Sequence, residues 1–308
     1  MSPAVFRFDA MASACAVHLC PAPGIEVEAV AAAAEAEVRR IEARYSRYRA
    51  DSELTRLNRA ALRGDSVEID DETAGLLGFA QAIHRRSGGA FDITAGLLRK
   101  AWNFKAGGFK IARLPDPATL AALLPRVGLD KLRLSPGRLG FAVPGMELDL
   151  GGLGKEYAAD RAAEICAHLG ARHGFVDLAG DIRVIGAQPD GAPWRIGIRD
   201  PGDGARIVAE IALAGGALAT SGDYERFIMV EGRRYGHILD PRSGWPAQGL
   251  SSVTVIAEQC LVAGSLATAA LAQGTAGLAW LADLGVRHLA VDAAGAVHGT
   301  ELDAGARR

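Results

Sequence analysis

The chain has 308 residues, enough to bury a substantial hydrophobic core in one large domain or two closely packed ones. Its hydrophobic content is 49% and its formal net charge is only -2, which argues against a nucleic-acid-binding surface and a disordered acidic tail. No uncharged apolar stretch predicts a membrane span, and the N-terminal stretch lacks the pattern of a signal peptide. The four cysteines have no zinc-binding spacing, so we expect reduced thiols and a cytoplasmic location.

Helices are predicted where apolar residues recur every three or four positions. This periodicity predicts a helix over 26–45 and another over 70–87, the second capped by acidic residues and ended by Gly88-Gly89. A short helix is expected from a cap at Asp51 or Ser52 through Asn58, and a further helical segment follows the turn at 91–96 and ends near Trp102. A loop at 105–117 leads into a short helix over 117–125. The remaining expected helices are one from 154 through Leu169 and a pair over 260–284 that is broken near Gly274.

Strands are predicted where apolar runs lie between turn residues. The expected strands are 4–20 with a turn at Met11-Ala12-Ser13, a hairpin of 132–134 with 140–143, a short strand at 147–150, a meander of 174–179, 181–186, 194–199 and 206–213, a strand at 252–257, and a terminal hairpin of 288–291 with 296–299. Because the strands cluster in the middle and the helices are scattered, an α+β fold is favoured over a doubly wound sheet.

The stretch from Thr220 to Pro246 gathers many candidate functional residues. The expected order is a turn at Thr220-Ser221-Gly222, a strand at 227–230, a hairpin turn at 231–233 and a return strand from Arg234 to Asp240. Such a hairpin brings His237 and Asp240 back toward the first turn. Each piece also has a purely structural interpretation, because turns are rich in Gly, Ser and Asp in any protein.

A second informative stretch runs from Glu147 to Tyr157, where a short strand leads into Gly151-Gly152-Leu153-Gly154 and then a helix. A helix N-terminus after a glycine-rich turn offers N–H groups and a positive dipole end to an anion such as phosphate. The spacing matches neither of the common phosphate-binding glycine motifs. Close packing of the helix on a sheet explains the glycines as well, so both interpretations stay open.

Taken in order along nearly the whole chain, these stretches resemble the ApbE family of FAD:protein FMN transferases. The matching segments are Met11-Ala12-Ser13, SRYRADSEL, GGAFDITAGLL with Trp102-Asn103-Phe104, LDLGGLGK, AGDIRVIG, WRIGIRDP, ATSGDYERF, GHILDPRSGWP, SVTVIAE and SLATA. The resemblance implies an α+β, T-fold-like architecture of mostly antiparallel sheets with flanking helices. It implies one domain over 1–308, with a flavin cleft between two interlocked halves.

The resemblance also implies a reaction and its residues. The diphosphate of FAD is cleaved with the help of Mg²⁺, FMN is esterified to a threonine of a target protein, and AMP leaves. The implied flavin-binding residues are Met11, Tyr48 (as an aromatic face for the isoalloxazine ring), Ala90, Phe91, Asp92, Asp149, Lys155 (near the phosphates) and Ile238. The implied metal ligands are the carbonyls of Gly152 and Ala267 and the hydroxyl of Thr268, with waters and substrate phosphates.

His237 resembles the family's histidine beside the reacting phosphate, where an imidazole is suited to take the threonine proton near pH 7. Two structural alternatives stay open: His237 as a hydrogen-bonded core histidine, and Tyr48 as an aromatic that packs where a helix gives way to a loop.

The chain departs from the family pattern at four places. The family's MGT is Met11-Ala12-Ser13 here, its KG is Lys155-Glu156, its GGD is Ala179-Gly180-Asp181, and the aspartate of its metal motif, four residues before Thr268, is Gly264. Because Mg²⁺ usually needs a carboxylate, the change at 264 is expected to weaken metal binding. Lys155 and Glu156 are hypothetical sources of compensation, although Glu156, one helical position on, would point in another direction.

Two functions follow from these observations. The first is a working FAD:protein FMN transferase that modifies a partner flavoprotein; the intact TSGDY, HILDP and FDIT segments favour it. The alternative is a flavin-binding paralogue that has lost transfer and serves as a flavin-binding protein or in another flavin-dependent reaction; Gly264 and the altered MGT favour it. An increase in flavin transfer on Gly264→Asp is the expected result that supports the first.

Overall fold

The computed structural model describes residues 2–102, 104, 113–224 and 226–300, so most of the loop expected at 105–117 lies outside the described residues. The helices are α1 (Val27–Tyr45), α2 (Glu53–Arg63), α3 (Asp71–Arg86), α4 (Pro117–Leu123), α5 (Gly154–His168), α6 (Cys260–Ala272) and α7 (Ala276–Asp283), with 3-10 helices η1 (Ala95–Lys100), η2 (Leu124–Arg126) and η3 (Leu129–Lys131). The strands are β1 (Ala4–Ala10), β2 (Ser13–Leu19), β3 (Ser66–Glu68), β4 (Leu132–Ser135), β5 (Arg138–Phe141), β6 (Gly174–Leu178), β7 (Asp181–Gly186), β8 (Trp194–Arg199), β9 (Ile207–Leu213), β10 (Ala217–Gly222), β11 (Phe227–Val230), β12 (Arg233–Gly236), β13 (Leu250–Ala257), β14 (Arg287–Asp292) and β15 (Val297–Gly299).

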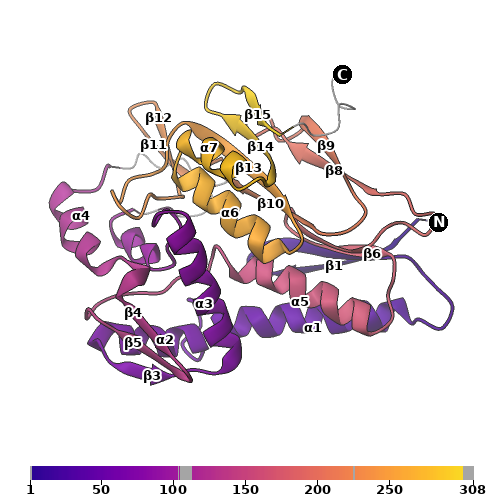
Figure 1. The fold of residues 1–308 in the computed structure, drawn as a ribbon, viewed down its shortest axis with the longest axis horizontal. Coiled ribbons are helices and arrows are strands. Elements are labelled where there is room, and N and C mark those ends of the chain that lie inside the picture. Colours follow the sequence, from indigo (N-terminus) through magenta and orange to yellow (C-terminus); the bar gives the residue numbers. More distant parts are fainter. Residues whose placement is uncertain (1, 103, 105–112, 225, 301–308) are drawn as a thin grey trace.

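An eight-stranded antiparallel sheet in the order β1-β2-β6-β7-β10-β13-β14-β15 runs through the molecule (Figure 1). Side chains alternate between its two faces, as the pleat of a strand requires. On β10, Ala217 and Ala219 face the large core beneath α1, α5 and α6, whereas Leu218 faces a second core formed with β8 and β9. The β8-β9 ribbon therefore covers the face of the sheet that the helices leave open.

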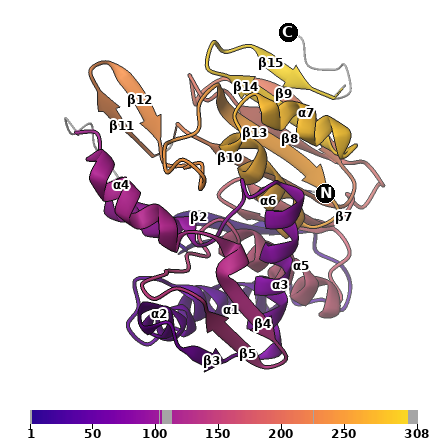
Figure 2. The same ribbon diagram turned by 60° about the vertical axis from the view of Figure 1, so that its left-hand side comes forward.

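The rest of the chain packs beside this layered unit. Helices α2 and α3 and the small sheet β3-β5-β4 lie on the side of α1 (Figure 2), and their buried residues continue the large core. A third cluster joins η1 and α4 to the β11-β12 hairpin. At its centre is Trp102, whose indole N–H donates to the carbonyl oxygen of Gly244 at 2.7 Å. The mixture of antiparallel sheets and helices confirms the predicted α+β fold.

Most predicted helices and both predicted caps are confirmed. The Ser52 hydroxyl accepts a hydrogen bond from the Thr55 N–H at the start of α2, and the Asp70 carboxylate accepts one from the Thr73 N–H at the start of α3. Helix α2 continues to Arg63, beyond the predicted end at Asn58. No helix in the described part of the chain is both long and apolar enough to cross a membrane.

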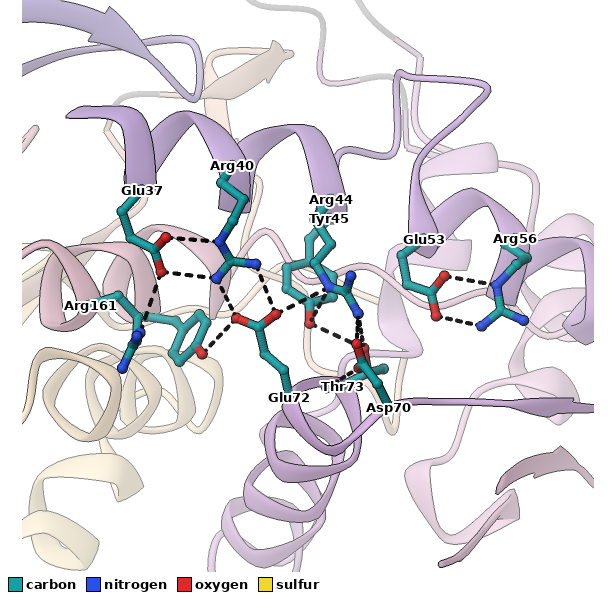
Figure 3. Close-up of polar contacts among 11 residues, drawn as sticks. Glu37, Arg40, Arg44, Tyr45, Glu53, Arg56, Asp70, Glu72, Thr73 and Arg161 are labelled. Carbon is teal, nitrogen blue, oxygen red and sulfur yellow. Dashed lines mark hydrogen bonds and ion pairs between the residues drawn. The ribbon is translucent and has the colours of Figure 1, made fainter. Parts of the chain in front are cut away.

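A charge network ties α1 to the first turn of α3 and to α5 (Figure 3). The Glu72 carboxylate accepts from Arg40 Nη2 at 2.6 Å and from the hydroxyl of Tyr157 in α5 at 2.9 Å, and it lies 3.2 Å from Arg44 Nε. Arg40 also pairs with Glu37 in α1. Because Glu72 joins three helices and sits at the positive end of α3, it contributes more than an isolated surface ion pair.

Replacing Glu72 by alanine is expected to lower the free energy of unfolding by about 2 kcal/mol, since it removes several charge-assisted hydrogen bonds at once. Chemical denaturation measures the change. Asp71→Ala, an exposed acid in the same turn, is the matched control and should cost less than about 0.5 kcal/mol. Equal losses in the two variants would contradict a special role for the network.

Three strand predictions are wrong. Thr220-Ser221-Gly222 is not a turn but the end of the central strand β10, paired with β13. Residues 147–150 form no strand, because the side-chain amide of Asn58 hydrogen-bonds the N–H and carbonyl of Leu148 in place of a neighbouring strand. The predicted meander divides: β6 and β7 stay in the main sheet, while β8 and β9 form a separate two-stranded sheet.

The β11-β12 hairpin is confirmed, with a return strand that ends earlier than predicted, at Gly236. Its two-residue turn is Glu231-Gly232, where both residues have positive φ, 50° and 78°. Such a turn matches the twist of two paired strands. The main sheet also opens with a hairpin, β1-β2, whose turn residues Met11 and Ala12 have φ of 54° and 57°.

Candidate functional site

Residues far apart in sequence meet at one end of the main sheet. The β1-β2 turn, the β6-β7 turn at Ala179-Gly180 and the C-terminal end of β10 all lie there, because Cys15 pairs with Leu178 and Leu218 pairs with Ile182. The N-terminus of α5 comes to the same end, since Lys155 Nζ lies 2.9 Å from Asp181 Oδ2 at the start of β7.

The glycine-rich entry to α5 is open on the side where a ligand would approach. A Cβ atom added to Gly152 or Gly154 would meet no heavy atom within 4 Å, and neither residue has a positive φ. Close packing against the sheet therefore does not explain these glycines. The N–H groups of Leu153 and Gly154 donate to the Leu150 carbonyl oxygen at 3.0 and 2.7 Å, and no side chain caps the helix. The positive end of the α5 dipole therefore favours an anion at this open position.

Two buried carboxylates lie beside this helix start. Asp181 is 2% exposed, and burial raises its pKa, while the neighbouring Lys155 ammonium acts in the opposite direction. Glu156 is 6% exposed; burial, and secondly the charge of Asp181, raise the pKa of its carboxyl to about 8. Among the described residues, Glu156 Oε2 has no hydrogen-bond partner.

The Glu156 side chain points across to α6, against Gly264. A Cβ added to Gly264 would lie only 2.5 Å from Glu156 Cγ and 2.7 Å from its Oε1. The expectation that Glu156 points away from the metal motif is therefore wrong. Its side chain reaches α6 and occupies the volume in which a side chain at position 264 would begin.

Helix α6 carries further oxygen atoms to the same place. The Thr268 hydroxyl, one helical turn after Gly264, lies 2.7 Å from the Ser221 hydroxyl at the end of β10. Ser265 is fully buried, and within the described ranges its hydroxyl has no hydrogen-bond partner. Asp160 fixes the start of α6 by accepting from the N–H groups of Cys260 and Leu261 at 2.8 and 2.9 Å.

The described ranges contain no group of three or more His, Cys, Asp or Glu side chains arranged to hold a metal ion. A magnesium site does not need such a group, because hydroxyl and carbonyl oxygens, waters and substrate phosphates complete its shell around one carboxylate. The Glu156 carboxyl, which has one orphaned oxygen and lies against Gly264, one helical turn before Thr268, fits that donor set. Of the predicted ligands, Ala267 precedes Thr268 in α6, and Gly152 lies in the glycine-rich turn just before α5.

Tyr48 and Asp149 form a second polar cluster, joined by Arg47. The Tyr48 ring is 81% exposed, so the packing alternative does not hold. The Arg47 guanidinium lies 5.0 Å from the centre of that ring and donates to the Tyr48 hydroxyl at 2.9 Å. Arg47 also forms an ion pair with Asp149, whose other oxygen accepts from the Gly151 N–H at 2.9 Å. The predicted flavin platform is thus tied to the glycine-rich turn.

The segment at 90–92 is buried. Ala90 and Phe91 are 2% and 3% exposed, and the Asp92 carboxylate accepts from Thr94 N–H at 2.7 Å and from Leu129 N–H at 2.9 Å. Burial raises the Asp92 pKa, although the Thr94 hydrogen bonds act in the opposite direction. These bonds hold the loop between α3 and η1; the predicted flavin contacts of this segment stay predictions.

Met11 lies in the β1-β2 turn with its N–H donating to the carboxylate of Glu42 in α1, at 2.6 Å. A surface depression of about 430 Å³ opens beside this turn and is lined in part by Ala12, Ser13 and Glu42. Its position next to Met11, at the site end of the sheet, is compatible with the predicted contact of Met11 with a ligand.

His237 follows β12 and is half-buried rather than enclosed in a core. Its backbone N–H donates to the carbonyl oxygen of Arg226 at 3.0 Å, and its Nδ1 lies 3.2 Å from the same oxygen. The hairpin brings it back toward β10 as predicted, because a Cβ at Gly236 would lie 2.6 Å from Cβ of Asp223. The neighbouring Ile238 is held by a bond from Ala247 N–H to its carbonyl at 2.9 Å.

Reasoning from sequence missed four supporting residues. They are Glu42 behind Met11, Arg47 between Tyr48 and Asp149, Asp181 beside Lys155, and Ser221 against Thr268. Three of them, Arg47, Asp181 and Ser221, lie inside segments already singled out: SRYR, AGDIRVIG and TSGDY. Glu42 lies 31 residues from Met11, and Arg47 lies 102 residues from Asp149, so spacing alone carried no signal for these pairings.

An antiparallel sheet backed by helices, with a lysine, an open helix N-terminus and clustered oxygen donors at one end, is typical of a protein that acts on an anionic, phosphate-bearing ligand. The comparisons with known proteins define it further. The ApbE family model matches residues 11–290, and the chain belongs to that family.

Individual relatives agree with this placement. The chain is 34% identical to the FAD:protein FMN transferase of Haemophilus influenzae, over 76% of this chain and 69% of that protein, and 33% identical to that of Vibrio cholerae, over 74% and 69%. Among solved structures, the ApbE protein of Thermotoga maritima superimposes with a TM-score of 0.89 at 32% identity, covering 97% of both chains. The apo flavinyl transferase ApbE of Pseudomonas stutzeri gives 0.86 at 30% identity, over 98% and 96%.

Proposed function

We propose that this protein transfers FMN from FAD to a threonine side chain of an acceptor protein. The single observation that carries the proposal is the family match over residues 11–290, together with relatives that are FAD:protein FMN transferases. The threonine oxygen bonds to the phosphorus of the FMN half. The bond from that phosphorus to the bridging oxygen breaks, and AMP leaves with this oxygen. The alternative of a paralogue without transfer activity gains no support from the comparisons.

The N-terminus of α5 and Lys155 bind the diphosphate of FAD. The open space above Gly152 and Gly154 supports this assignment, because backbone N–H groups approach phosphate oxygens best where no Cβ intervenes. The exposed ring of Tyr48 stacks on the isoalloxazine, and Asp149, held by Arg47, contacts the polar groups of the ligand. The remaining predicted contacts are made by Met11, Ala90, Phe91, Asp92 and Ile238.

His237 takes the proton of the threonine hydroxyl. The Arg226 carbonyl oxygen beside Nδ1 accepts hydrogen bonds and cannot donate, so the bond requires the proton on Nδ1. The basic lone pair then belongs to Nε2, the tautomer that a general base needs. The backbone of Arg226 thus orients the imidazole as well as selecting its tautomer.

The carbonyls of Gly152 and Ala267 and the hydroxyl of Thr268 would hold a magnesium ion. When bound, it supplies positive charge that neutralises the negative charge of the diphosphate. The bond between Thr268 and Ser221 orients the threonine hydroxyl and leaves an oxygen lone pair for a cation.

Incubation with FAD, Mg²⁺ and a threonine-containing acceptor tests the proposal. We expect a flavin phosphate adduct on the acceptor by intact-mass spectrometry, with AMP formed in equal amount. An acceptor with valine in place of the threonine is the matched control and should stay unlabelled. If neither an adduct nor AMP forms from FAD, with the acceptor or without it, the proposed function is wrong.

The acceptor must share a compartment with this protein. The proposal therefore links the predicted cytoplasmic location to a cytoplasmic acceptor protein. Fractionation of cells that express the full chain, followed by detection of both proteins, tests that location directly.

A further inference from the structure

We infer that Glu156 of α5 supplies the carboxylate of the cation site, in the volume that a side chain at position 264 of α6 would fill. The inference rests on the proposed function, because it assigns an additional ligand to the magnesium ion proposed there. It goes beyond the family resemblance, in which position 156 carries no acid.

The first argument is spatial. A Cβ at 264 would lie 2.5 Å from Glu156 Cγ, closer than real Cβ atoms approach a carbon, so the two positions share one volume. Thr268 follows Gly264 by one helical turn and lies on the same face of α6. The Glu156 carboxylate, lying against Gly264, is therefore on the side of α6 that carries the Thr268 hydroxyl.

The second argument is the cost of leaving this group without a ligand. Glu156 is 6% exposed, and within the described residues its Oε2 accepts no hydrogen bond. A buried polar oxygen without a partner is destabilising, and buried carboxylates are normally paired with a donor or a metal. The buried hydroxyl of Ser265, beside Gly264, also lacks a partner in the described part of the chain. A hard cation with oxygen ligands would satisfy this orphaned oxygen.

The third argument comes from the two departures in sequence. Where the family pattern has glycine after the lysine and an aspartate in α6, this chain has Glu156 and Gly264. Taken separately, one change adds an acid and the other removes one. Because the two positions meet in space, the two changes together move the carboxylate from α6 to α5. The number of acids at these two positions stays the same.

Glu156 as a space-filling, uncharged carboxyl group is the competing interpretation. Glu156→Gln separates the two, because glutamine keeps the shape and removes the anionic ligand. Glu164→Gln is the matched control: Glu164 is the same residue type on the same helix, and it pairs with Arg161 at the surface.

The experiment is a titration of the full-length protein with Mn²⁺, followed by electron paramagnetic resonance of the free ion, with Mg²⁺ added as competitor. We expect one Mn²⁺ to bind and Mg²⁺ to displace it. Glu156→Gln should weaken binding at least about tenfold, while Glu164→Gln should stay within about twofold. The double variant Glu156→Gly with Gly264→Asp should bind within about threefold of the original chain, because it returns the carboxylate from α6.

Cation binding by Glu156→Gln that equals the original chain overturns the inference, as does the absence of any cation site in the original chain. Quenching of FAD fluorescence, measured on the same samples, reports FAD binding independently of cation binding. It therefore distinguishes a wrong assignment of Glu156 from a wrong proposed function. A protein that binds FAD and Mn²⁺ but is indifferent to Glu156→Gln loses only the role of Glu156. A protein that does not bind FAD loses the proposed function itself.

Discussion

Gly264→Asp alone is expected to destabilise the protein and lower its flavin transfer, the opposite of what the sequence pattern predicts. The new Cβ would overlap Glu156 Cγ, and two carboxylates would be buried together. Overpacking and an additional buried acid should together cost about 3 kcal/mol or more. For a chain of 308 residues, a loss of about 3 kcal/mol corresponds to a fall in the melting temperature of about 5 °C, measured by calorimetry or circular dichroism.

Removing the Glu156 side chain should rescue this variant. In the Glu156→Gly background, Gly264→Asp has room for its side chain, so the two changes should be strongly non-additive. Gly264→Ala isolates the steric part of the effect, and Gly75→Asp, at an open position in α3, controls for an aspartate placed in a helix. Additive losses from the two substitutions would refute the shared volume.

His237→Asn is expected to reduce the rate of flavin transfer by about 10² to 10⁴ while leaving the fold intact. The asparagine amide can still donate to the Arg226 carbonyl oxygen, which holds the position of the side chain, but it offers no basic nitrogen. Transfer is measured as flavin adduct formed per minute at saturating FAD. The dissociation constant of FAD should change only a few-fold, because the imidazole acts on the acceptor hydroxyl.

His173→Asn is the control for this substitution. His173 also places Nδ1 against a backbone carbonyl, that of Ala187 at 2.8 Å, but it lies at the opposite end of β6 and β7 from the site. Its replacement should leave the transfer rate within about twofold. A His237→Asn variant that retains a tenth or more of the original rate would remove His237 as the base.

Elements whose signal is local could be predicted from the sequence. The repeat of apolar residues marks α1, and Asp70 at the start with Gly88-Gly89 at the end delimits α3. Central strand β10 was missed because Thr220-Ser221-Gly222 is small and polar. Its conformation comes from pairing with β13, 30 or more residues later, where the Thr220 and Thr254 hydroxyls lie 2.8 Å apart.

The site could be predicted as a set of segments but not as a geometry. Family segments identified His237, Lys155 and Thr268, and the fold brings the elements that carry them to one end of the sheet. The contact between Glu156 and Gly264 could not be predicted from the sequence. Each residue is a single departure from the family pattern, and only the packing of α5 against α6 shows that the two meet. A contact between one residue of each helix produces no repeating pattern in the sequence of either helix.

The shared volume of positions 156 and 264 also limits how such a chain can have evolved. Moving the acid from α6 to α5 by single substitutions requires one of two intermediates. The first has an acid at both positions, and the two side chains collide. The second has glycine at both positions and lacks the carboxylate. The second intermediate avoids this collision, so it is the more accessible route. Searches for related genes should therefore accept an acid at either position, since a filter that demands aspartate in α6 would discard lineages that completed the exchange.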